Sequence, residues 1–196
     1  MNRKFLVVAG IVVILFIIGF LLYKFSFVRD GQNPKPLSNE TDDWATYINN
    51  EYGYSIKYPK GWRTQDEQEE DRGGISFARE LFPDEVTTEE DFGKLGYQIN
   101  TMAGADDTLN TLSIVEWVKK ANWIRSRSEY KEENVIVDNN SAVKVCAFRE
   151  DFPGCSIFIA KDANIYVLEL IYYNGSISTE ADKVFGQMVS TFAFLE

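Results

Sequence analysis

The chain has 196 residues, a formal net charge of −10, 45% hydrophobic residues and 14% aromatic residues. This length suits one domain of ordinary size with an appendage, and this apolar content supports a packed core rather than a disordered chain. From Gly31 onward, 16 Lys and Arg residues stand against 29 Asp and Glu residues, and such an acidic body repels phosphate backbones, which argues against a nucleic-acid partner.

Residues 1–25 are predicted to anchor the chain in a membrane. The segment 5–22, FLVVAGIVVILFIIGFLL, has no charged residue, and as a helix it would span roughly the hydrocarbon thickness of a bilayer. A cleaved signal peptide is the alternative, but its apolar region is usually shorter, and no A-x-A-like site follows this one. Arg3 and Lys4 precede the segment, and a slight positive-inside bias favours a cytoplasmic N-terminus. We therefore expect a single-pass signal anchor that holds residues 26–196 outside the cytoplasm.

Residues 26–43 are predicted to form a flexible linker. They include two prolines, one glycine and many polar residues, a composition typical of a tether rather than of a packed element. The folded body, residues 44–196, then begins at Trp44.

Two strands, 44–49 and 54–58, are predicted at the start of the body. The second strand alternates, so its apolar side chains would share one face: Tyr54, Ile56 and Tyr58. Pro59 opens a turn that ends this strand, and Trp62 just beyond the turn can fold back onto the apolar face. Aromatic residues near lysines can also line a ligand cleft, but alternating positions more often face a core.

The next part of the body is predicted to be rich in loops. Exposed acidic loops are expected at 65–71 and 80–94, with short strands at 75–79 and 97–103. The acidic runs 66–71 and 84–91 could bind calcium, but neither matches the EF-hand pattern, so solvated loops are the preferred interpretation. A helix follows at 111–122, where Ile114 and Val118 lie on one apolar stripe.

Four antiparallel strands and a closing helix complete the prediction. The strands are expected at 134–138, 142–149, 155–161 and 165–173, separated by short turns. The last strand is apolar on both faces apart from Glu169, so it should be central and covered on both sides. The helix begins near Ser178. The fold class is therefore α+β, an antiparallel sheet with helices packed on its faces.

Cys146 and Cys155 are predicted to form a disulfide. They lie on consecutive strands around a turn at 150–153, so a hairpin would place them opposite each other. Outside the cytoplasm the pair would be oxidised, and closing a loop of this length would add roughly 2–3 kcal/mol to the free energy of unfolding. Two buried free thiols are the alternative if the body is cytoplasmic.

Three segments resemble the PsbP-like group, which includes the extrinsic photosystem II subunit PsbP, membrane-anchored bacterial proteins and a Ran-binding import factor. They are YGYSIKYPKGW at 52–62, which contains Tyr54, Tyr58, Pro59 and Trp62, LSIVEW at 112–117, and STF at 190–192. The resemblance covers roughly residues 44–196, and the first segment is the distinctive one. It implies an α-β-α sandwich with a binding or assembly role rather than catalysis. Photosynthetic members bind calcium or manganese partly through histidine, which this chain lacks.

Function is predicted only as a class. The absence of histidine removes the commonest general base and the commonest zinc ligand. No catalytic residue, metal ligand or cofactor is therefore predicted. We expect a membrane-anchored, extracytoplasmic binding or assembly domain, which uses segment 5–22 to hold the membrane and binds a protein partner or small ligand of the envelope. The alternatives are a hydrolase that uses carboxylates and a calcium-dependent interaction module.

Overall fold

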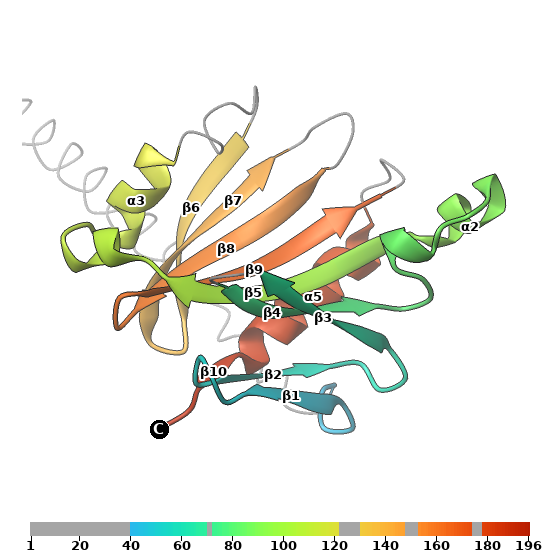
Figure 1. The fold of residues 1–196 in the computed structure, drawn as a ribbon, viewed down its shortest axis with the longest axis horizontal. Helices are drawn as coiled ribbons and strands as arrows, with labels where there is room; N and C mark the ends of the chain where they lie inside the picture. The colour runs from blue at the N-terminus through green and yellow to red at the C-terminus, as the bar shows by residue number, and fades with distance from the viewer. Residues whose placement is uncertain (1–39, 70–71, 122–129, 148–152, 174–177) are drawn as a thin grey trace, which may run out of the picture. The chain divides into compact units, whose positions relative to one another are not determined.

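Two antiparallel sheets form the framework of the domain in this computed structural model (Figure 1). The structure describes residues 40–69, 72–121, 130–147, 153–173 and 178–196, which belong to one unit, Ser38–Glu196. The smaller sheet has the order β1-β2-β10, and the larger sheet has the order β3-β4-β5-β9-β8-β7-β6. The predicted α+β class with antiparallel strands is confirmed, but the strands are divided between two sheets rather than one.

The strands of the large sheet are β3 (Arg63–Glu69), β4 (Arg72–Ala78), β5 (Tyr97–Ala105), β6 (Tyr130–Val137), β7 (Asn140–Ala147), β8 (Gly154–Lys161) and β9 (Asn164–Tyr172). β9 lies at the centre of the order, as its apolar character on both faces predicted. The small sheet consists of β1 (Ala45–Asn49), β2 (Tyr54–Tyr58) and β10 (Ala193–Phe194). The predicted strands at 44–49 and 54–58 are thus confirmed.

The helices are α2 (Glu89–Lys94), α3 (Ile114–Lys120) and α5 (Thr179–Thr191), with two short 3-10 turns, η1 (Pro83–Glu85) and η2 (Asp107–Asn110). α3 begins at Ser113, whose hydroxyl accepts from the backbone N–H of Glu116 in a capping box. α5 begins at Ser178, whose hydroxyl accepts from the backbone N–H of Ala181. Both predicted helices are therefore present.

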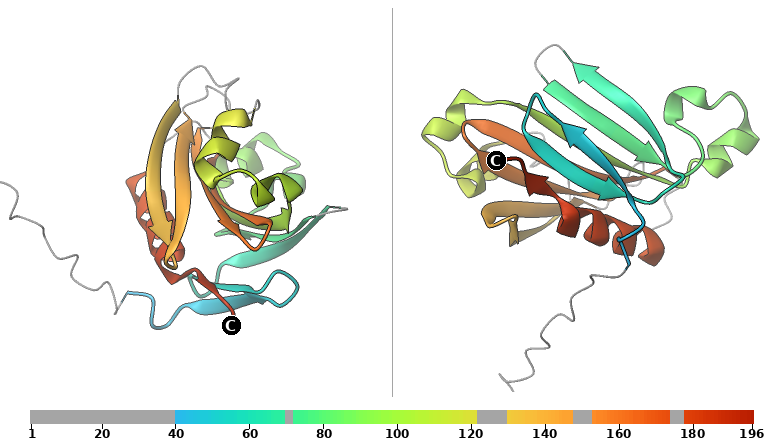
Figure 2. Two further views of the ribbon diagram at one scale, coloured as in Figure 1. Left: turned by 90° about the vertical axis from the view of Figure 1, so that its left-hand side faces the viewer. Right: turned by 90° about the horizontal axis from the view of Figure 1, so that it is seen from below.

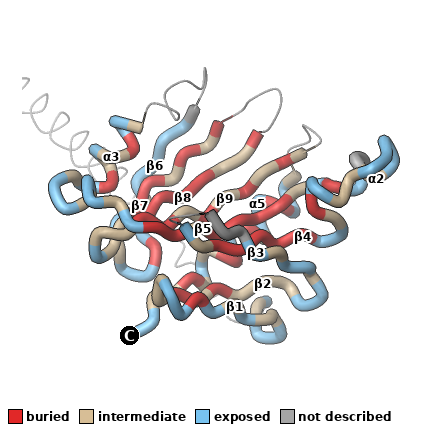
Figure 3. Tube along the Cα trace, viewed as in Figure 1, coloured by how far each residue is buried: buried red, intermediate tan, exposed pale blue. Residues whose placement is uncertain are grey.

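One face of the large sheet is covered by α5 and the small sheet, and the other face carries α3 (Figure 2). On the first face, Ala181, Phe185 and Met188 of α5 are buried with β2, β8 and β9 residues in the main core. On the second face, Ile114 and Val118 of α3 pack against Val143 and Phe158 in a smaller core. Burial is accordingly concentrated in the middle strands (Figure 3).

A row of polar side chains crosses the second face of the sheet. Ser76 on β4 pairs with Asn100 on β5, Asn100 with Glu169 on β9, and Glu169 with Ser156 on β8. The Ser76 hydroxyl donates to Asn100 Oδ1 at 2.9 Å, and the Ser156 hydroxyl donates to Glu169 Oε1 at 3.0 Å. Ser76 and Ser156 are fully buried, so these bonds satisfy groups that would otherwise be costly to bury.

Three sequence predictions are wrong. The segment 65–71, expected as a loop, is mostly strand β3, because an edge strand can be highly charged and needs no apolar face. The segment 80–94, also expected as a loop, contains η1 and α2, and Thr88 caps α2 by accepting from the backbone N–H of Asp91. The two-residue strand β10 was not predicted at all, because so short a strand has no period.

The predicted anchor 1–25 lies outside the described residues, as does most of the predicted linker 26–43. Within the described part of the chain, no helix is long and apolar enough to cross a membrane. The end of the predicted linker is described, and there Glu40 forms a salt bridge of 2.8 Å with Lys183 of α5. Of the predicted turn at 150–153, only Pro153 lies within the described residues.

Candidate functional site

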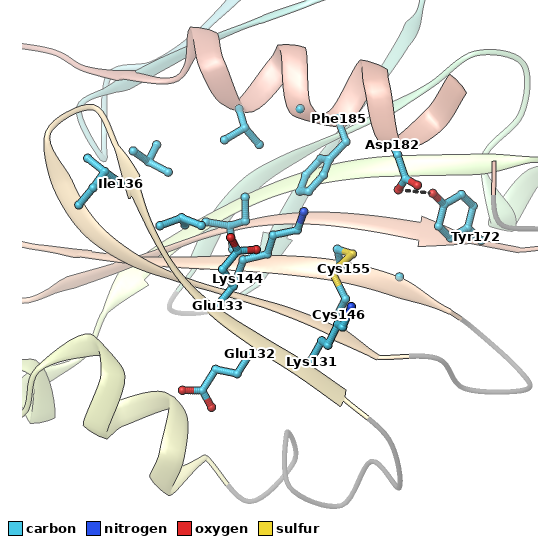
Figure 4. A pocket seen from close by; sticks show the side chains of 16 residues that line it. Lys131, Glu132, Glu133, Ile136, Lys144, Cys146, Cys155, Tyr172, Asp182 and Phe185 are labelled. Atoms are coloured by element: carbon cyan, nitrogen blue, oxygen red, sulfur yellow. Dashed lines mark hydrogen bonds between the residues drawn. A yellow bond between two sulfur atoms is a disulfide. The ribbon is translucent and has the colours of Figure 1, made fainter. Parts of the chain in front are cut away.

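A groove with a volume of about 810 Å³ lies between α5 and the strands β6, β7 and β8 (Figure 4). This volume falls within the range of known ligand pockets, about 300–1,000 Å³. Its lining residues come from α5, from the end of β9 and from the strands β6, β7 and β8: Lys131, Glu132, Glu133, Val135, Ile136, Val137, Lys144, Cys146, Gly154, Cys155, Ile157, Tyr172, Asp182, Phe185, Gly186 and Val189.

The floor of the groove becomes more exposed with distance from the β6–β7 turn. Near the turn, Val137 is buried against Ala142 and the main core. Further along, Val135, Lys144 and Cys146 are half-buried, and Glu133 is exposed. α5 thus covers the central strands of this face and leaves the last two strands open to solvent beside it.

A disulfide lies in this floor. Cys146 and Cys155 are directly opposite each other on β7 and β8, and their sulfur atoms are bonded at 2.08 Å. Both side chains are half-buried, so the bond is part of the groove surface as well as a link between two strands (Figure 4).

Gly186 makes the helix side of the groove open. It lies within α5, and a Cβ atom added to it would have no other heavy atom within 4 Å. Glycine in a helix interior is less favourable than alanine by about 1 kcal/mol. Since alanine would fit, packing within the described part of the chain does not require this glycine. Its effect is to let a bound group approach the helix backbone.

The polar groups of the groove lie at its rim. The Tyr172 hydroxyl lies 2.7 Å from Asp182 Oδ1 and donates to it. Burial of this hydroxyl, together with the neighbouring Asp182 carboxylate, raises the pKa of Tyr172. The tyrosine therefore remains a neutral donor that holds the carboxylate in place. On the strand side, Glu133 and Lys144 are cross-strand partners of opposite charge.

The aromatic block predicted from the sequence lies in the core instead of at this groove. Tyr54 is fully buried, its hydroxyl lies 3.0 Å from Thr101 Oγ1, and its ring stacks on Phe192 at 5.3 Å. Tyr58 and Trp62 are half-buried and pack against the main core.

Pro59 takes part in the turn after β2, where its carbonyl oxygen accepts from the backbone N–H of Trp62 at 3.1 Å. Burial raises the pKa of Tyr54, as expected for a tyrosine in a core. The positions of these side chains thus do not support the alternative that the aromatic residues line a ligand cleft.

Within the described residues, the acidic segment 84–91 does not form a calcium site. Among the residues that the structure describes, no group of three or more Asp, Glu, His or Cys side chains could hold a metal ion. Three carboxylates of 84–91 have partners within the protein: Glu85 binds Arg63, Asp84 accepts from Gln65, and Asp91 accepts from Thr88.

Sequence reasoning found the two cysteines of the groove but not the groove itself. Gly186 was missed, although a lone glycine inside an otherwise regular helical pattern is a signal that deserves a physical reason. Lys131 and Glu133 were missed because β6 begins at Tyr130, earlier than the predicted strand 134–138.

The fold is shared with a known protein. No protein-family model matches the sequence, and a comparison with curated proteins gives no match. Among solved structures, cyanobacterial PsbP (CyanoP) from Synechocystis is similar, with 12% identity over 76% of this chain and 91% of that chain and a TM-score of 0.50. The predicted PsbP-like fold is therefore confirmed, as a likeness of fold.

Two further structures are similar at lower scores. The Ran-binding protein Mog1p from Saccharomyces cerevisiae has 10% identity over 79% of this chain and 96% of that chain, with a TM-score of 0.46. LpqN from Mycobacterium tuberculosis, involved in cell envelope biogenesis, has 10% identity over 80% and 88%, with a TM-score of 0.45. Such scores say nothing about function.

Proposed function

We propose that this chain is a membrane-anchored binding domain without catalytic activity, and that a protein partner occupies the groove between α5 and β6–β8. The observation that carries the proposal is the unfilled helix wall at Gly186, which faces a partly apolar floor. If this position affected only stability, alanine would be the more favourable residue here.

The chemistry of the groove favours binding over hydrolysis. Two of its carboxylates, Glu133 and Asp182, belong to exposed residues, and Asp182 accepts a hydrogen bond from Tyr172. A hydrolase that relies on carboxylates needs two of them aimed at one reacting bond, with one held in a dry setting as the general acid. Nothing in the groove favours that arrangement.

The openness of the groove favours a protein over a small ligand. Lys131, Glu133, Asp182 and Gly186 are all exposed, so a small molecule bound among them would remain largely in water. Pockets for small ligands usually bury most of the ligand surface. A protein segment could cover the floor and remain continuous with a larger contact outside it.

The proposed location is the extracytoplasmic side of a membrane, with segment 5–22 as the anchor. The uninterrupted apolar run of that segment supports the anchor. The disulfide between Cys146 and Cys155 supports an oxidising compartment, because such bonds persist there and are rare in the cytosol.

Crosslinking in the native membrane tests the groove. A photo-reactive amino acid would replace Glu133, which is exposed on β6, and the captured protein would be identified. We expect capture to be lost in Gly186→Phe, which fills the groove, and retained in Glu180→Phe. Glu180 is an exposed residue of the same helix that does not line the groove. Equal capture by both variants would contradict the proposal.

Thiol labelling of intact cells tests the location. With a membrane-impermeant maleimide, Cys146 and Cys155 should react only after an external reductant is added. Labelling without reductant would show free thiols, and labelling only after the cells are opened would place the domain in the cytoplasm.

A further inference from the structure

Within the described residues, the outer edge of β6 pairs with no other strand, and β6 also contributes to the floor of the groove. In the described part of the chain, the β6 backbone pairs with β7 alone and ends the large sheet. We infer that the partner binds as an extended peptide that adds an antiparallel strand to β6, with apolar residues followed by basic residues. This inference rests on the proposed function of the groove and names the segment that enters it.

The β6–β7 turn determines which backbone groups face outward. Residues 138 and 139 form a two-residue turn with φ of 45° and 61°, and Val137 lies opposite Asn140. In such hairpins the closing pair exchanges both backbone hydrogen bonds, and bonded pairs then alternate along the ladder. The N–H and C=O groups that point away from β7 are therefore those of Glu132, Asn134 and Ile136.

The side chains along β6 divide it into an apolar end and a charged end. Ile136 is 69% exposed, an unusual exposure for a large apolar side chain in a strand. Its neighbours Val135 and Val137 face the groove side of the sheet. An added strand with apolar residues opposite this end would cover Ile136 and extend the groove floor.

The charged end supplies the complementarity that identifies the peptide. Glu132 and Glu133 are adjacent and exposed, and Figure 4 shows them on opposite faces of the sheet. Lys131 precedes them. Opposite charges in directly facing positions stabilise an antiparallel pair. An added strand therefore needs two basic residues opposite the two glutamates and an acidic residue opposite Lys131.

A second copy of this chain fits the edge less well. If two β6 strands paired antiparallel about Asn134, Glu132 would face Ile136 and Glu133 would face Val135 of the other copy. Both carboxylates would then lie opposite apolar side chains, without a cation. The charge pattern thus favours a different, basic and apolar peptide.

The register converts this pattern into a sequence that can be synthesised. Read antiparallel from Val137 to Lys131, the facing positions require three apolar residues, one polar residue, two basic residues and one acidic residue. The capped heptapeptide VIVTKKE satisfies this order, and VIVTEEK reverses its charges. As an added strand either would extend for about 23 Å.

The experiment measures the binding of these labelled peptides to the full chain in detergent micelles by fluorescence anisotropy. The test variant is Asn134→Pro, which removes one outward N–H and places a proline ring on the free edge, where proline is tolerated. Its matched control is Asn134→Ala, which keeps the backbone donor. Because each variant is measured in the same micelles, any binding to detergent cancels in the comparison.

We expect VIVTKKE to bind the wild type and Asn134→Ala with equal affinity, and to bind Asn134→Pro at least tenfold more weakly. The charge-reversed peptide VIVTEEK should bind the wild type at least tenfold more weakly than VIVTKKE does. The double variant Glu132→Lys/Glu133→Lys should reverse the preference between the peptides. A peptide N-methylated at its fourth residue should also bind at least tenfold more weakly, which tests the edge even if the proline variant fails to fold. No binding up to 1 mM, or equal binding by Asn134→Pro, would overturn the inference.

Two further outcomes separate this inference from the proposed function. If Gly186→Phe abolishes capture in the membrane while Asn134→Pro has no effect on it, the groove is the binding site and the added strand is wrong. If the chain forms dimers that Asn134→Pro converts to monomers, the edge is used by a second copy and the peptide is wrong.

Discussion

The large sheet ends in two strands, β3 and β6, which are protected very differently. At the β3 edge, the two terminal guanidinium nitrogens of Arg63, Nη1 and Nη2, donate to the Glu85 carboxylate, at 2.7 and 2.6 Å, and Gln65 donates to Asp84 at 2.9 Å. These bonds hold the segment around η1 against the strand. At the β6 edge, the backbone beyond β7 meets no other strand of the described chain.

The difference shows that one edge strand of a sheet can be protected against pairing with other chains while the other remains available for it. Unpaired edges invite pairing with other chains, and proteins usually blunt them with charge or cover them. β3 is charged along its length and its side chains bind the segment around η1, whereas β6 is charged in its first half and apolar in its second. An edge left half-unprotected beside an open groove is the place where a partner strand would cause least disruption.

The largest expected effect on stability comes from the disulfide that supports the β6 side. Cys146→Ala/Cys155→Ala should lower the free energy of unfolding by about 2–3 kcal/mol, because a closed loop of this length restricts the unfolded chain. Urea denaturation measures the loss, and hydrogen exchange should accelerate in β6–β8 more than in β3–β5.

The reduced wild type is the control for this double variant and should show a similar loss. A loss below about 0.5 kcal/mol, or equal acceleration at both edges, would mean that the two sides of the sheet are not separately supported.

Alkaline pH should test two tyrosines that are cross-strand partners on β5 and β9 in the middle of the sheet. Burial, together with Asp182, raises the pKa of Tyr172 beside the groove, and burial raises the pKa of Tyr97 on β5 to about 12. Above pH 10 the unfolded chain loses these protons while the folded chain keeps them. The free energy of unfolding should therefore fall as pH rises, by at most about 1.4 kcal/mol per pH unit for each tyrosine.

Tyr172→Phe and Tyr97→Phe should each make this alkaline loss less steep in denaturation curves between pH 9 and 11. If neither variant changes the dependence of the free energy of unfolding on pH, the loss of stability comes from other groups, such as lysines.

Gly186→Ala should raise the free energy of unfolding by about 0.5–1 kcal/mol, because alanine is the better helix former and its Cβ meets only open space. Thermal denaturation would show the gain. A decrease instead would mean that the helix wall of the groove is already packed and that the β6 side is not open.

Arg63→Ala should have the smallest effect, a loss of stability close to the error of the measurement. The side chains of Arg63 and Glu85 are 46% and 34% exposed, and exposed ion pairs contribute little. Glu85→Gln is a matched control, since it removes the charge and keeps the size. A loss as large as that of Cys146→Ala/Cys155→Ala would show that the bonds between β3 and the η1 segment stabilise the fold.

The sequence was informative where side chains alternate or recur with a clear period. Tyr54 and Ile56 marked β2, the apolar run after Asn164 marked β9, and Ser178 marked the start of α5. It failed where structure depends on tertiary pairing. The charged segment of β3 is a strand because β4 lies beside it, and β10 exists only because β2 accepts it.

The candidate site was the least predictable part. A groove is a space left between elements, and no local pattern describes how far α5 extends across the sheet. The cysteine pair could be predicted from the sequence because the turn between the two strands determines which residues lie opposite each other. The place of Gly186 in the groove could not be predicted, because it depends on which strands lie opposite the helix.

The polar row across the sheet helps to fix the register in which neighbouring strands pair. If β8 slipped by two residues against β9, every side chain would keep its face and the apolar pattern would still match. Ser156 would then face Val167 or Ile171 instead of Glu169. Its buried hydroxyl would lose its acceptor, at a cost of about 1–3 kcal/mol. The polar row therefore disfavours a register shift of two residues, which the alternation of apolar and polar residues does not disfavour.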